Sequence, residues 1–412
     1  MRKPAALLVV TLACCGSIDA QAPKLKAEQW REDLRYFARE MPQRHKNLYH
    51  ATTKEQFDRA VADLDAQIPT LQPHQIVVKL HQIAATVGDG HTGVHFPPYF
   101  KHYPIALFWF GKELRVVAAA KEYERALGTR LVKIGALPLD EVQARAVTCM
   151  PSAENENEWL VLSTSPMMIA TPEILHTLGV VPDLAHASFT FETDEGQQFS
   201  LDLAAIEMPL VNGVPTLKLN PAAKTEPLFR QKPADRFWFT WLEEPKTVYV
   251  NFRGYDGLGD NAKEMFEFVD DHPTQKLVID LRQNGGGDFF KGRKHLIEPL
   301  KSRPALNQKG HLFVVIGRRT FSAAMVNAID FRKETRAILV GEPIGERPNS
   351  YSENDEMTLP NSRLVVSYST RYYQFLDQDV PAVLPDKLIE PSWPEFKAGR
   401  DPVMEWVLLA SE

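Results

Sequence analysis

The carboxyl-terminal half of the chain alternates short apolar runs with helix-like segments, and this succession constrains the fold more than any other feature. Lys276–Leu281 contains a continuous apolar stretch, which is typical of a strand buried on both faces of a parallel sheet. Further strands are expected at Thr247–Phe252, Leu312–Ile316 and Ala337–Gly341, with helices at Asn261–Val269, Phe290–Leu300 and Ala323–Phe331. This order predicts an α/β layer with a largely parallel sheet.

Two other patterns precede this half. Between residues 26 and 87, apolar residues such as Trp30, Leu34 and Phe37 recur at spacings of three and four, which predicts helices. Beyond Pro97 the runs are short and β-rich, at Ile105–Phe110, Leu114–Ala119, Leu131–Ile134 and a hairpin over Ser188–Leu203. We therefore expect a helical domain at 24–97, a β-rich module at 98–217, a polar linker at 218–235 and an α/β domain at 236–412.

The first twenty residues do not resemble part of a fold. Residues 1–20 combine a basic start, an apolar stretch and a small residue at the end, which predicts a cleaved signal and export to a periplasmic or extracellular location. The segment around Cys14 also resembles a lipoprotein cleavage box, so attachment through a lipid at Cys14 is the alternative. Cys149 is then the only interior cysteine, and no intrachain disulfide is expected.

Composition excludes two classes of protein. The 412 residues are 44% apolar, and Lys+Arg 47 against Asp+Glu 53 gives a formal charge of −6. No basic block is present, so nucleic acid is not an expected partner. No run approaches the roughly 18–20 apolar residues that span a bilayer, so a transmembrane segment is not expected either.

A glycine-rich turn follows the buried strand, at Gly285–Gly287. A turn without side chains lets backbone N–H groups approach a ligand, where they stabilise an oxyanion or hold a phosphate. No Gly-Lys-Ser/Thr follows, so a nucleotide P-loop is disfavoured. The alternative is a merely flexible turn.

A serine stands where the next strand turns into a helix. Ser322 follows Leu312–Ile316 and precedes small residues, so a nucleophile there would sit at the sheet's carboxyl edge and at a helix N-terminus. The segment is not a Gly-x-Ser-x-Gly elbow. Met325 at the third position after the serine excludes a Ser-x-x-Lys dyad. The alternative role for Ser322 is an ordinary helix N-cap.

His91 lies in the glycine-rich stretch Gly88–Gly93. The stretch formally matches Gly-x-Gly-x-x-Gly, but a helical pattern precedes it and prolines follow, so a dinucleotide fingerprint is excluded. A histidine in such a loop can act as a general base, although a lone loop histidine is more often a surface residue. His91 and His95 lack further ligands at metal-site spacing, and no metal or cofactor is expected.

Together these segments resemble one family. They are Gly88–Thr92, Asp280–Gly287, Thr320–Ala324, Gly341–Pro343 and Leu384–Asp386. They are similar to the core of the C-terminal processing (tail-specific) serine peptidases over most of residues 26–408. The resemblance implies an α/β fold with a helical N-terminal segment and a C-terminal crotonase/ClpP-like catalytic domain. Gly128–Val142 resembles the end of a PDZ-type module, which implies a PDZ-like β-rich middle part.

The resemblance also implies roles for individual residues. Ser322 takes the nucleophile's position, and the oxyanion hole falls on Gly286, Gly287 and Ala323. Arg347 stands where the tail-specific subgroup has its lysine base. Because arginine stays protonated at any working pH, it cannot accept the serine proton, and a Ser/Lys dyad is excluded.

The other branch resembles the tricorn core protease, in which a histidine is the base. His91 matches that histidine, and Asp379 is the best match to the acid that completes the relay. Gly90 stands where tricorn has a serine before the histidine, so that part of the relay is missing.

The expected function is therefore an exported serine-type peptidase that hydrolyses peptide bonds of a peptide or protein substrate through an acyl-enzyme on Ser322. Two alternatives remain on the same fold: a catalytically silent protein that binds a hydrophobic ligand or peptide, and a non-peptidase esterase.

Overall fold

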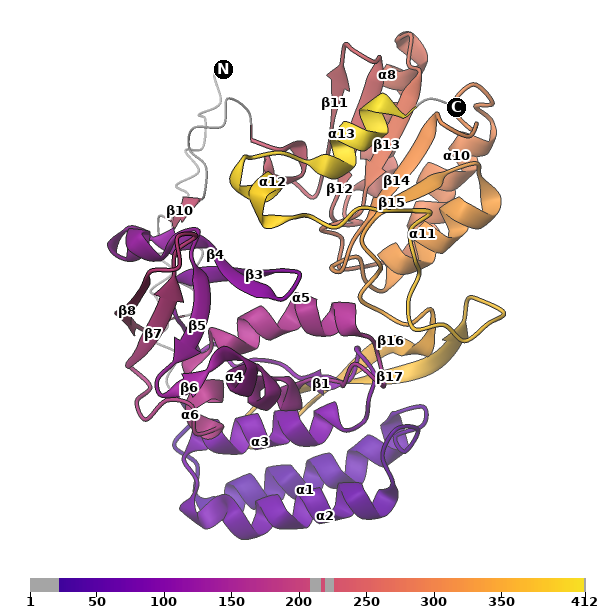
Figure 1. Ribbon diagram of the computed structural model, residues 1–412. Coiled ribbons are helices and arrows are strands. Elements are labelled where there is room, and N and C mark those ends of the chain that lie inside the picture. The colour runs from indigo at the N-terminus through magenta and orange to yellow at the C-terminus, as the bar shows by residue number, and fades with distance from the viewer. Residues whose placement is uncertain (1–21, 208–215, 219–225, 411–412) are drawn as a thin grey trace, which may run out of the picture.

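The structure is a computed structural model that describes residues 22–207, 216–218 and 226–410 (Figure 1). The predicted signal at 1–20, with Cys14, lies outside the described residues, and so do residues 219–225 of the predicted linker. Within the described part, no helix is both long and apolar enough to cross a membrane.

Three helices form the N-terminal layer, as the apolar spacing predicts. They are α1 (Ala27–Arg44), α2 (Lys54–Gln67) and α3 (Pro73–Ala85), with a 3-10 turn at Ile68–Thr70. Their apolar stripes are buried, and Trp30, Leu34 and Phe37 on α1 are no more than 3% exposed. α3 ends three residues before Gly88, where the chain enters the loop that carries His91.

The middle module contains the expected strands. They are β3 (Ile105–Phe110), β4 (Glu113–Ala120), β5 (Arg130–Ile134), β6 (Leu137–Pro138), β7 (His186–Glu192), β8 (Gln198–Ala204) and β10 (Thr216–Lys218). The sheet order is β10-β4-β5-β7-β8, with β3 paired to β4 and β6 to β5. β2 (Lys101–His102) and β9 (Ile206–Glu207) pair separately.

Helices interrupt this module, which the sequence pattern did not predict. They are α4 (Leu139–Ala146), α5 (Glu158–Ile169) and α6 (Pro172–Thr177), with 3-10 turns at Lys121–Ala126 and Val147–Cys149. α5 lacks the helical spacing of apolar residues, because Trp159 to Leu162 are apolar in succession. The period that identifies an amphipathic helix is therefore absent there.

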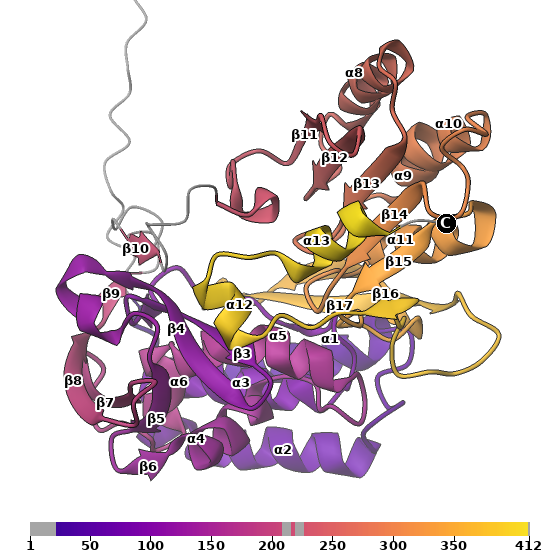
Figure 2. The same cartoon turned by 45° about the horizontal axis from the view of Figure 1, so that its top comes forward.

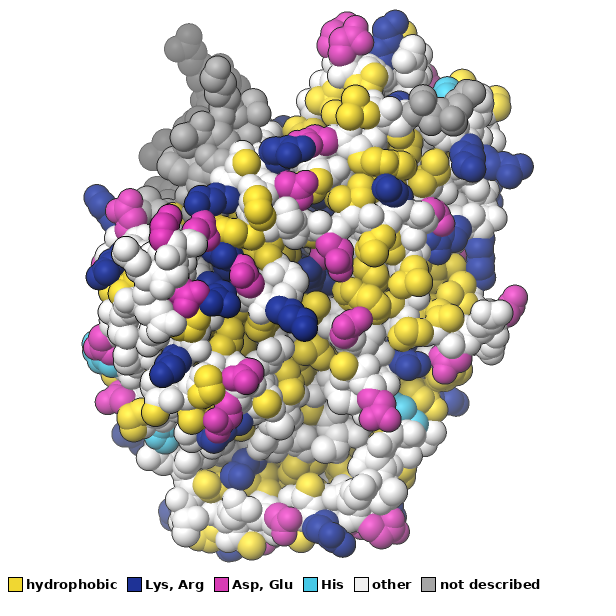
Figure 3. Space-filling model, in the orientation of Figure 1, with side chains coloured by type: hydrophobic (Ala, Val, Ile, Leu, Met, Phe, Trp, Pro, Cys, Tyr) yellow, Lys and Arg dark blue, Asp and Glu magenta, His cyan; other side chains and the backbone are white. Residues whose placement is uncertain are grey.

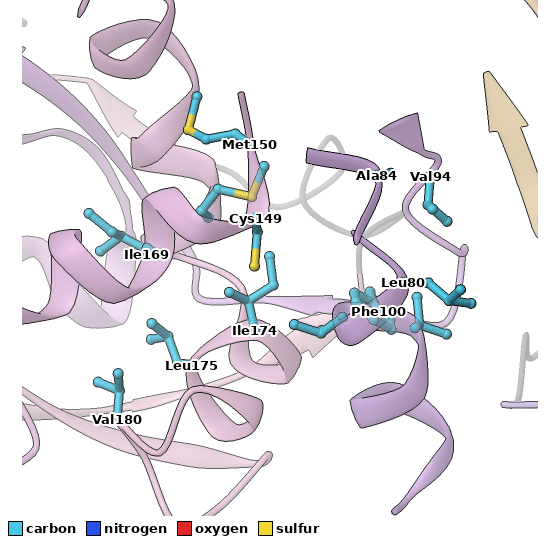
Figure 4. Close-up of a cluster of buried hydrophobic side chains, with 14 of the residues drawn as sticks. Leu80, Ala84, Val94, Phe100, Cys149, Met150, Ile169, Ile174, Leu175 and Val180 are labelled. Carbon is cyan, nitrogen blue, oxygen red and sulfur yellow. The ribbon is translucent and has the colours of Figure 1, made fainter. Parts of the chain in front are cut away.

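One hydrophobic core joins the N-terminal helices to the middle module. Figure 4 shows Leu80 and Ala84 of α3 in the same cluster as Cys149, Ile169 and Ile174. The predicted boundary at residues 97 and 98 therefore does not separate two cores.

The C-terminal domain is the expected α/β layer. Its strands are β11 (Phe237–Leu242), β12 (Thr247–Phe252), β13 (Lys276–Asp280), β14 (Leu312–Ile316), β15 (Ile338–Gly341) and β18 (Lys387–Leu388). They lie side by side in that order, with β11 antiparallel and the others parallel. This confirms the predicted parallel sheet.

Helices cover both faces of this sheet. α8 (Leu258–Asp271), α9 (Phe289–Gly292), a π-helical turn at Arg293–Ile297, α10 (Glu298–Lys301) and α11 (Ala323–Glu334) supply the core on one face. α13 (Pro402–Leu409) packs on the other face, and α12 (Trp393–Lys397) and a 3-10 turn at Leu228–Arg230 lie outside the sheet. Because both faces are covered, the central strands are fully buried.

A long hairpin that the sequence pattern did not predict connects the two halves of the molecule. β16 (Asn349–Thr358) pairs with β17 (Val365–Gln374), which also pairs with β1 (Gly93–Val94) through Gly93 and Ser367. Figures 1 and 2 both place this hairpin between the α/β domain and the N-terminal helices. Met357, Leu364 and Val366 belong to the core of the N-terminal helices, so the His91 loop is held by residues far along the chain.

Candidate active site

Ser322 occupies the turn between β14 and α11 in an unusual conformation. Its φ is 54° and its ψ is −125°, and its side chain makes no capping hydrogen bond to the helix. A non-glycine residue in this region costs on the order of 1–3 kcal/mol and persists only when the surroundings enforce it. The N-cap role considered for Ser322 is thus not the one that its hydroxyl performs, and the hydroxyl is available for chemistry.

The glycine turn after β13 packs directly against this serine. A Cβ placed on Gly286, whose φ is +110°, would lie 2.7 Å from the Ser322 Cβ, and one on Gly287 would lie 2.5 Å from the Tyr255 ring. Such contacts do not occur between real side chains, so both positions require glycine.

Two backbone N–H groups beside Ser322 have no hydrogen-bond partner among the described residues: those of Gly287 and Ala323. Both residues line a cavity of about 400 Å³ together with Ser322. The N–H of Gly286, by contrast, donates to the Asn284 Oδ1 at 3.0 Å. Of the three residues predicted for an oxyanion hole, the geometry therefore favours Gly287 and Ala323.

His91 is brought to the serine from the other end of the chain. Its ring stacks on Phe321, the residue before Ser322, with centroids 4.8 Å apart and an interplanar angle of 27°. The side chain is buried, and burial lowers the pKa of His91 to about 4. The imidazole is therefore neutral at physiological pH, as a general base must be. Neither ring nitrogen has a hydrogen-bond partner among the described residues.

Glu346 connects these two residues and was missed by the sequence analysis. One of its carboxylate oxygens accepts the backbone N–H of Ser322, and the other lies 3.6 Å from the His91 Nδ1. Its side chain is 1% exposed. Burial, with the nearby Glu156 carboxylate adding to it, holds the pKa of Glu346 well above its usual range. One buried carboxylate thus lies against both the candidate nucleophile and the candidate base.

The signal that could have identified Glu346 is its place in the sequence. It stands 346 − 322 = 24 residues after the serine and directly before Arg347, the position compared with the family's lysine. A glutamate at this position belongs to no periodic pattern or motif, and only the structure shows that its side chain is buried.

Glu156, on the segment before α5, holds the loops on either side of the site. Its Oε1 accepts the Gly90 N–H at 2.6 Å and its Oε2 accepts the Arg347 N–H at 3.1 Å. Burial raises the pKa of Glu156 to about 7. Glu156 therefore fixes the backbone next to both His91 and Glu346.

Asp379 forms an ion pair with Arg347. The Asp379 side chain is 71% exposed, and its Oδ1 is 3.4 Å from the Arg347 Nη1. Arg347 also donates from Nε to the Glu156 carbonyl at 2.9 Å. Among the described residues, neither a hydrogen bond nor an ion pair joins Asp379 to His91, whereas the Glu346 Oε1 lies 3.6 Å from the His91 Nδ1.

One cluster of potential metal ligands lies behind the His91 loop: His45, His50 and Asp89. Both ring nitrogens of His45 are already engaged, Nε2 with the Asp89 Oδ2 at 2.9 Å and Nδ1 with the Asn47 N–H at 3.0 Å. A metal would have to displace these bonds, so the cluster fits a buried carboxylate–histidine pair better than a metal centre.

That pair supports the His91 backbone. The Asp89 Oδ1 accepts the His91 N–H at 3.1 Å and the Ser369 hydroxyl at 2.7 Å. Ser369 belongs to β17, so the hairpin and the N-terminal helices meet at this carboxylate.

Comparison with known proteins bears on the fold. No known family profile matches the chain, and no curated protein sequence matches it. Among solved structures, mature CPAF complexed with lactacystin matches with a TM-score of 0.60 and 10% identity, over 92% of this chain and 97% of that one. Mature CPAF alone gives 0.60 and 11%, over 92% and 96%.

The photosystem II D1 C-terminal processing protease also matches, with a TM-score of 0.41 and 13% identity over 88% of this chain and 93% of that one. Identities this low show a shared fold and not a shared activity. The chain therefore has the mixed α/β protease fold of CPAF, which is the fold that its resemblance to the C-terminal processing serine peptidases predicts.

Proposed function

We propose that the protein is a serine-type peptidase with Ser322 as nucleophile, His91 as general base and Glu346 as the acid that orients the base. The observation that carries the proposal is the position of the Glu346 carboxylate between the Ser322 N–H and the His91 Nδ1. The CPAF fold supports a peptidase in particular.

Each group then has a defined task. Because Glu346 lies beside Nδ1, His91 carries its proton on Nδ1, facing the Glu346 carboxylate. The Nε2 lone pair is then free to accept the Ser322 Oγ proton. Oγ bonds to the carbonyl carbon of the substrate, and the oxyanion that forms accepts hydrogen bonds from the Gly287 and Ala323 N–H groups. His91 passes the proton to the leaving amine, and a water deprotonated by His91 then releases the acyl group from Ser322.

The acid must be ionised for this scheme to work, because a negative Glu346 stabilises the imidazolium that forms on His91. In the free protein, burial and Glu156 oppose that ionisation. A positive charge on His91 lowers the cost of the buried carboxylate, so Glu346 releases its proton to solvent as the imidazolium forms. Asp379, exposed and paired with Arg347, takes no part.

The cavity beside Ser322 indicates which side chain lies next to the scissile bond. Its walls are mixed: one part is aromatic and aliphatic, formed by Phe289, Phe290, Met325, Val326, Tyr373 and Phe375, and the other part is polar, formed by Asp288, Glu346, Ser352, Glu353 and Arg371. A volume of about 400 Å³ is large enough for a single side chain, and the aromatic and aliphatic part of the wall favours an apolar one. Hydrolysis next to a large apolar residue is therefore the preferred cleavage.

Export remains part of the proposal through the signal predicted at residues 1–20, either as a soluble protein or attached through a lipid at Cys14.

A silent binding protein is the alternative, and one observation favours it: neither His91 nitrogen is hydrogen-bonded among the described residues. Catalytic hydrogen bonds often tighten only when substrate is bound, however.

The two functions are separated by incubating the purified protein with an unstructured protein such as casein and identifying the fragments by mass spectrometry. We expect cleavage by the wild type, mainly next to large apolar residues, and none by Ser322→Ala. Equal fragmentation by the two proteins would contradict the role of Ser322. An absence of fragments from both would favour the binding protein.

A further inference from the structure

A second, larger cavity lies outside the candidate active site. It has a volume of about 1050 Å³ and lies between the β-rich module and the α/β domain. No residue lines both this crevice and the cavity beside Ser322. Its walls come from β3, β4, the segment from Glu226 to Arg236, most of which belongs to the predicted linker, the ends of β14 and β15, and the segment from α12 to α13. On the face shown in Figure 3, apolar side chains lie between the two parts of the molecule, with basic and acidic side chains among them.

The charges that line this crevice are unequal. Seven arginines face four acidic residues, although the whole chain carries a formal charge of −6. Several of the arginines have structural partners: Arg282 pairs with Asp401 at 2.8 Å, Arg318 with Glu342, and Arg400 with Glu405.

Arg253 is satisfied differently, because its guanidinium donates to four backbone carbonyls, those of Lys232, Asp235, Phe229 and Gln231. Its hydrogen bonds hold the chain segment that borders the crevice.

The other three, Arg230, Arg236 and Arg319, have no ion pair or side-chain hydrogen bond among the described residues. The Arg230 guanidinium lies 3.7 Å from the Phe396 ring centroid. Burial lowers the pKa of Arg230 to about 10, whereas Arg319 is exposed. The charges of Asp401 and Glu226 act on Arg230, but none of the three guanidinium groups forms an ion pair within the described residues, so each can pair with a carboxylate of a ligand.

Apolar walls accompany these cations. Leu107 and Phe108 of β3, Val117 of β4, Ile316 of β14 and Phe396 of α12 line the same crevice. A ligand that matches them carries both anionic groups and apolar side chains.

The crevice is also coupled to the candidate active site through the chain. Arg319 stands three residues before Ser322 in the same turn, and Gln283, another lining residue, directly precedes Asn284 of the glycine turn. A peptide held at Arg319 thus contacts the segment that presents the nucleophile.

We propose that this crevice is a docking site for an acidic, partly apolar peptide segment, whose carboxylates pair with Arg230, Arg236 and Arg319. The segment belongs to the substrate at a distance from the bond that is cut, so the proposal rests on the proposed peptidase function. Fork-shaped guanidinium groups bind carboxylates with two parallel hydrogen bonds, and charge steers such a segment to the crevice before its scissile bond reaches Ser322.

The test measures peptide binding to the Ser322→Ala protein by fluorescence anisotropy, so that no peptide is cut. Three labelled peptides share one apolar framework. The first carries two Glu residues and a C-terminal amide, the second replaces both Glu by Gln, and the third has the Gln residues and a free C-terminal carboxylate. We expect the Glu peptide to bind at least about tenfold more tightly than the amidated Gln peptide. Tighter binding of the third peptide assigns the recognised carboxylate to the chain end.

The variants Arg319→Gln and Arg230→Gln, each in the Ser322→Ala background, are expected to lose that preference. Arg59→Gln, an exposed arginine on α2, is the matched control and is expected to keep it. If Arg319→Gln fails to fold, Arg319→Lys retains the charge without the fork and is expected to weaken the preference. Equal affinity for all three peptides, or an equal loss in Arg59→Gln, overturns the proposal.

The two proposals fail in different ways. Casein cleavage without any carboxylate preference in binding overturns the docking site and leaves the peptidase intact. Carboxylate-dependent binding without cleavage overturns the peptidase and its substrate, while the anion preference of the crevice itself is retained.

Discussion

At the scale of single residues, the candidate site is a set of side chains whose ordinary preferences are overridden. Ser322 adopts a positive φ, and its side chain does not cap the helix that follows. His91 and Glu346 are polar side chains that are buried. Each choice costs free energy by itself. Their coincidence around one cavity is the arrangement expected where function, rather than stability, selects the residues.

Ser322 and His91 could be proposed from the sequence because each stands in a recognisable segment, the strand-to-helix turn and the glycine-rich loop. Glu346 could not be predicted from the sequence, because an isolated glutamate belongs to no motif or periodic pattern, and its burial depends on the folded surroundings. Asp379 was chosen from its distance to a Pro-Asp pair, but its side chain points into solvent and is paired with Arg347.

The assignment of the acid leads to a direct comparison. Glu346→Gln keeps the size of the side chain but removes the charge that stabilises the imidazolium, so we expect kcat for peptide hydrolysis to fall about 10²- to 10⁴-fold. Asp379→Asn removes only an exposed ion pair and is expected to leave kcat within about twofold. Steady-state kinetics on one chromogenic peptide checks both, and the reverse order of effects would restore Asp379 as the acid.

At the scale of elements, the strands and helices that follow the periodic rules were predictable and the others were not. β3, β12 and β14 match the expected runs residue by residue. The β16–β17 hairpin escaped prediction because much of its outer half is polar and exposed, as at Glu353–Glu356. Its register is set by pairing with β1 and by packing on the N-terminal helices, contacts that no local pattern encodes.

Helix α3 carries a testable electrostatic consequence. Burial lowers the pKa of His81 to about 4, and its ring stacks on Phe96 with centroids 4.7 Å apart. Between pH 6.5 and pH 4 the unfolded chain binds a proton at this residue that the folded protein does not, so folding loses stability as the pH falls. One such group costs about 3 kcal/mol over that interval.

His81→Phe keeps the stacked ring and removes the proton. We therefore expect the variant's free energy of unfolding, measured by urea titration at pH 7 and pH 4.5, to fall less with acidification than that of the wild type. An unchanged difference between the two pH values would show that His81 takes up its proton in the folded protein as well.

At the scale of the whole molecule, the site exists only because the two ends of the chain meet. His91 and Ser322 are 322 − 91 = 231 residues apart in the sequence. The hairpin carries part of the C-terminal half into the N-terminal core, and Asp89 joins His45, the His91 loop and Ser369 of β17. The domain limits expected from the sequence do not include this contribution of the hairpin to the N-terminal core, because two segments that share one core are not separated by a recognisable linker.

Asp89 is the residue at which this assembly can be tested. Asp89→Ala leaves buried donors on His45 and Ser369 without an acceptor, so we expect a loss of about 3–5 kcal/mol in the free energy of unfolding and a large loss of activity. Asp58→Ala removes an exposed carboxylate that pairs with Lys54 on α2 and is expected to cost less than about 1 kcal/mol. Chemical denaturation compares them, and similar losses in both would mean that Asp89 does not hold the two ends together.

The claim on which the account depends is that Ser322 is an activated nucleophile served by His91. Labelling with a fluorophosphonate, followed by intact-mass analysis, measures this without knowledge of the substrate. We predict one adduct on the wild-type protein, none on Ser322→Ala, and labelling of His91→Ala slowed by at least about 100-fold. Wild-type protein that remains unlabelled, or labels no faster than Ser322→Ala, would contradict the account.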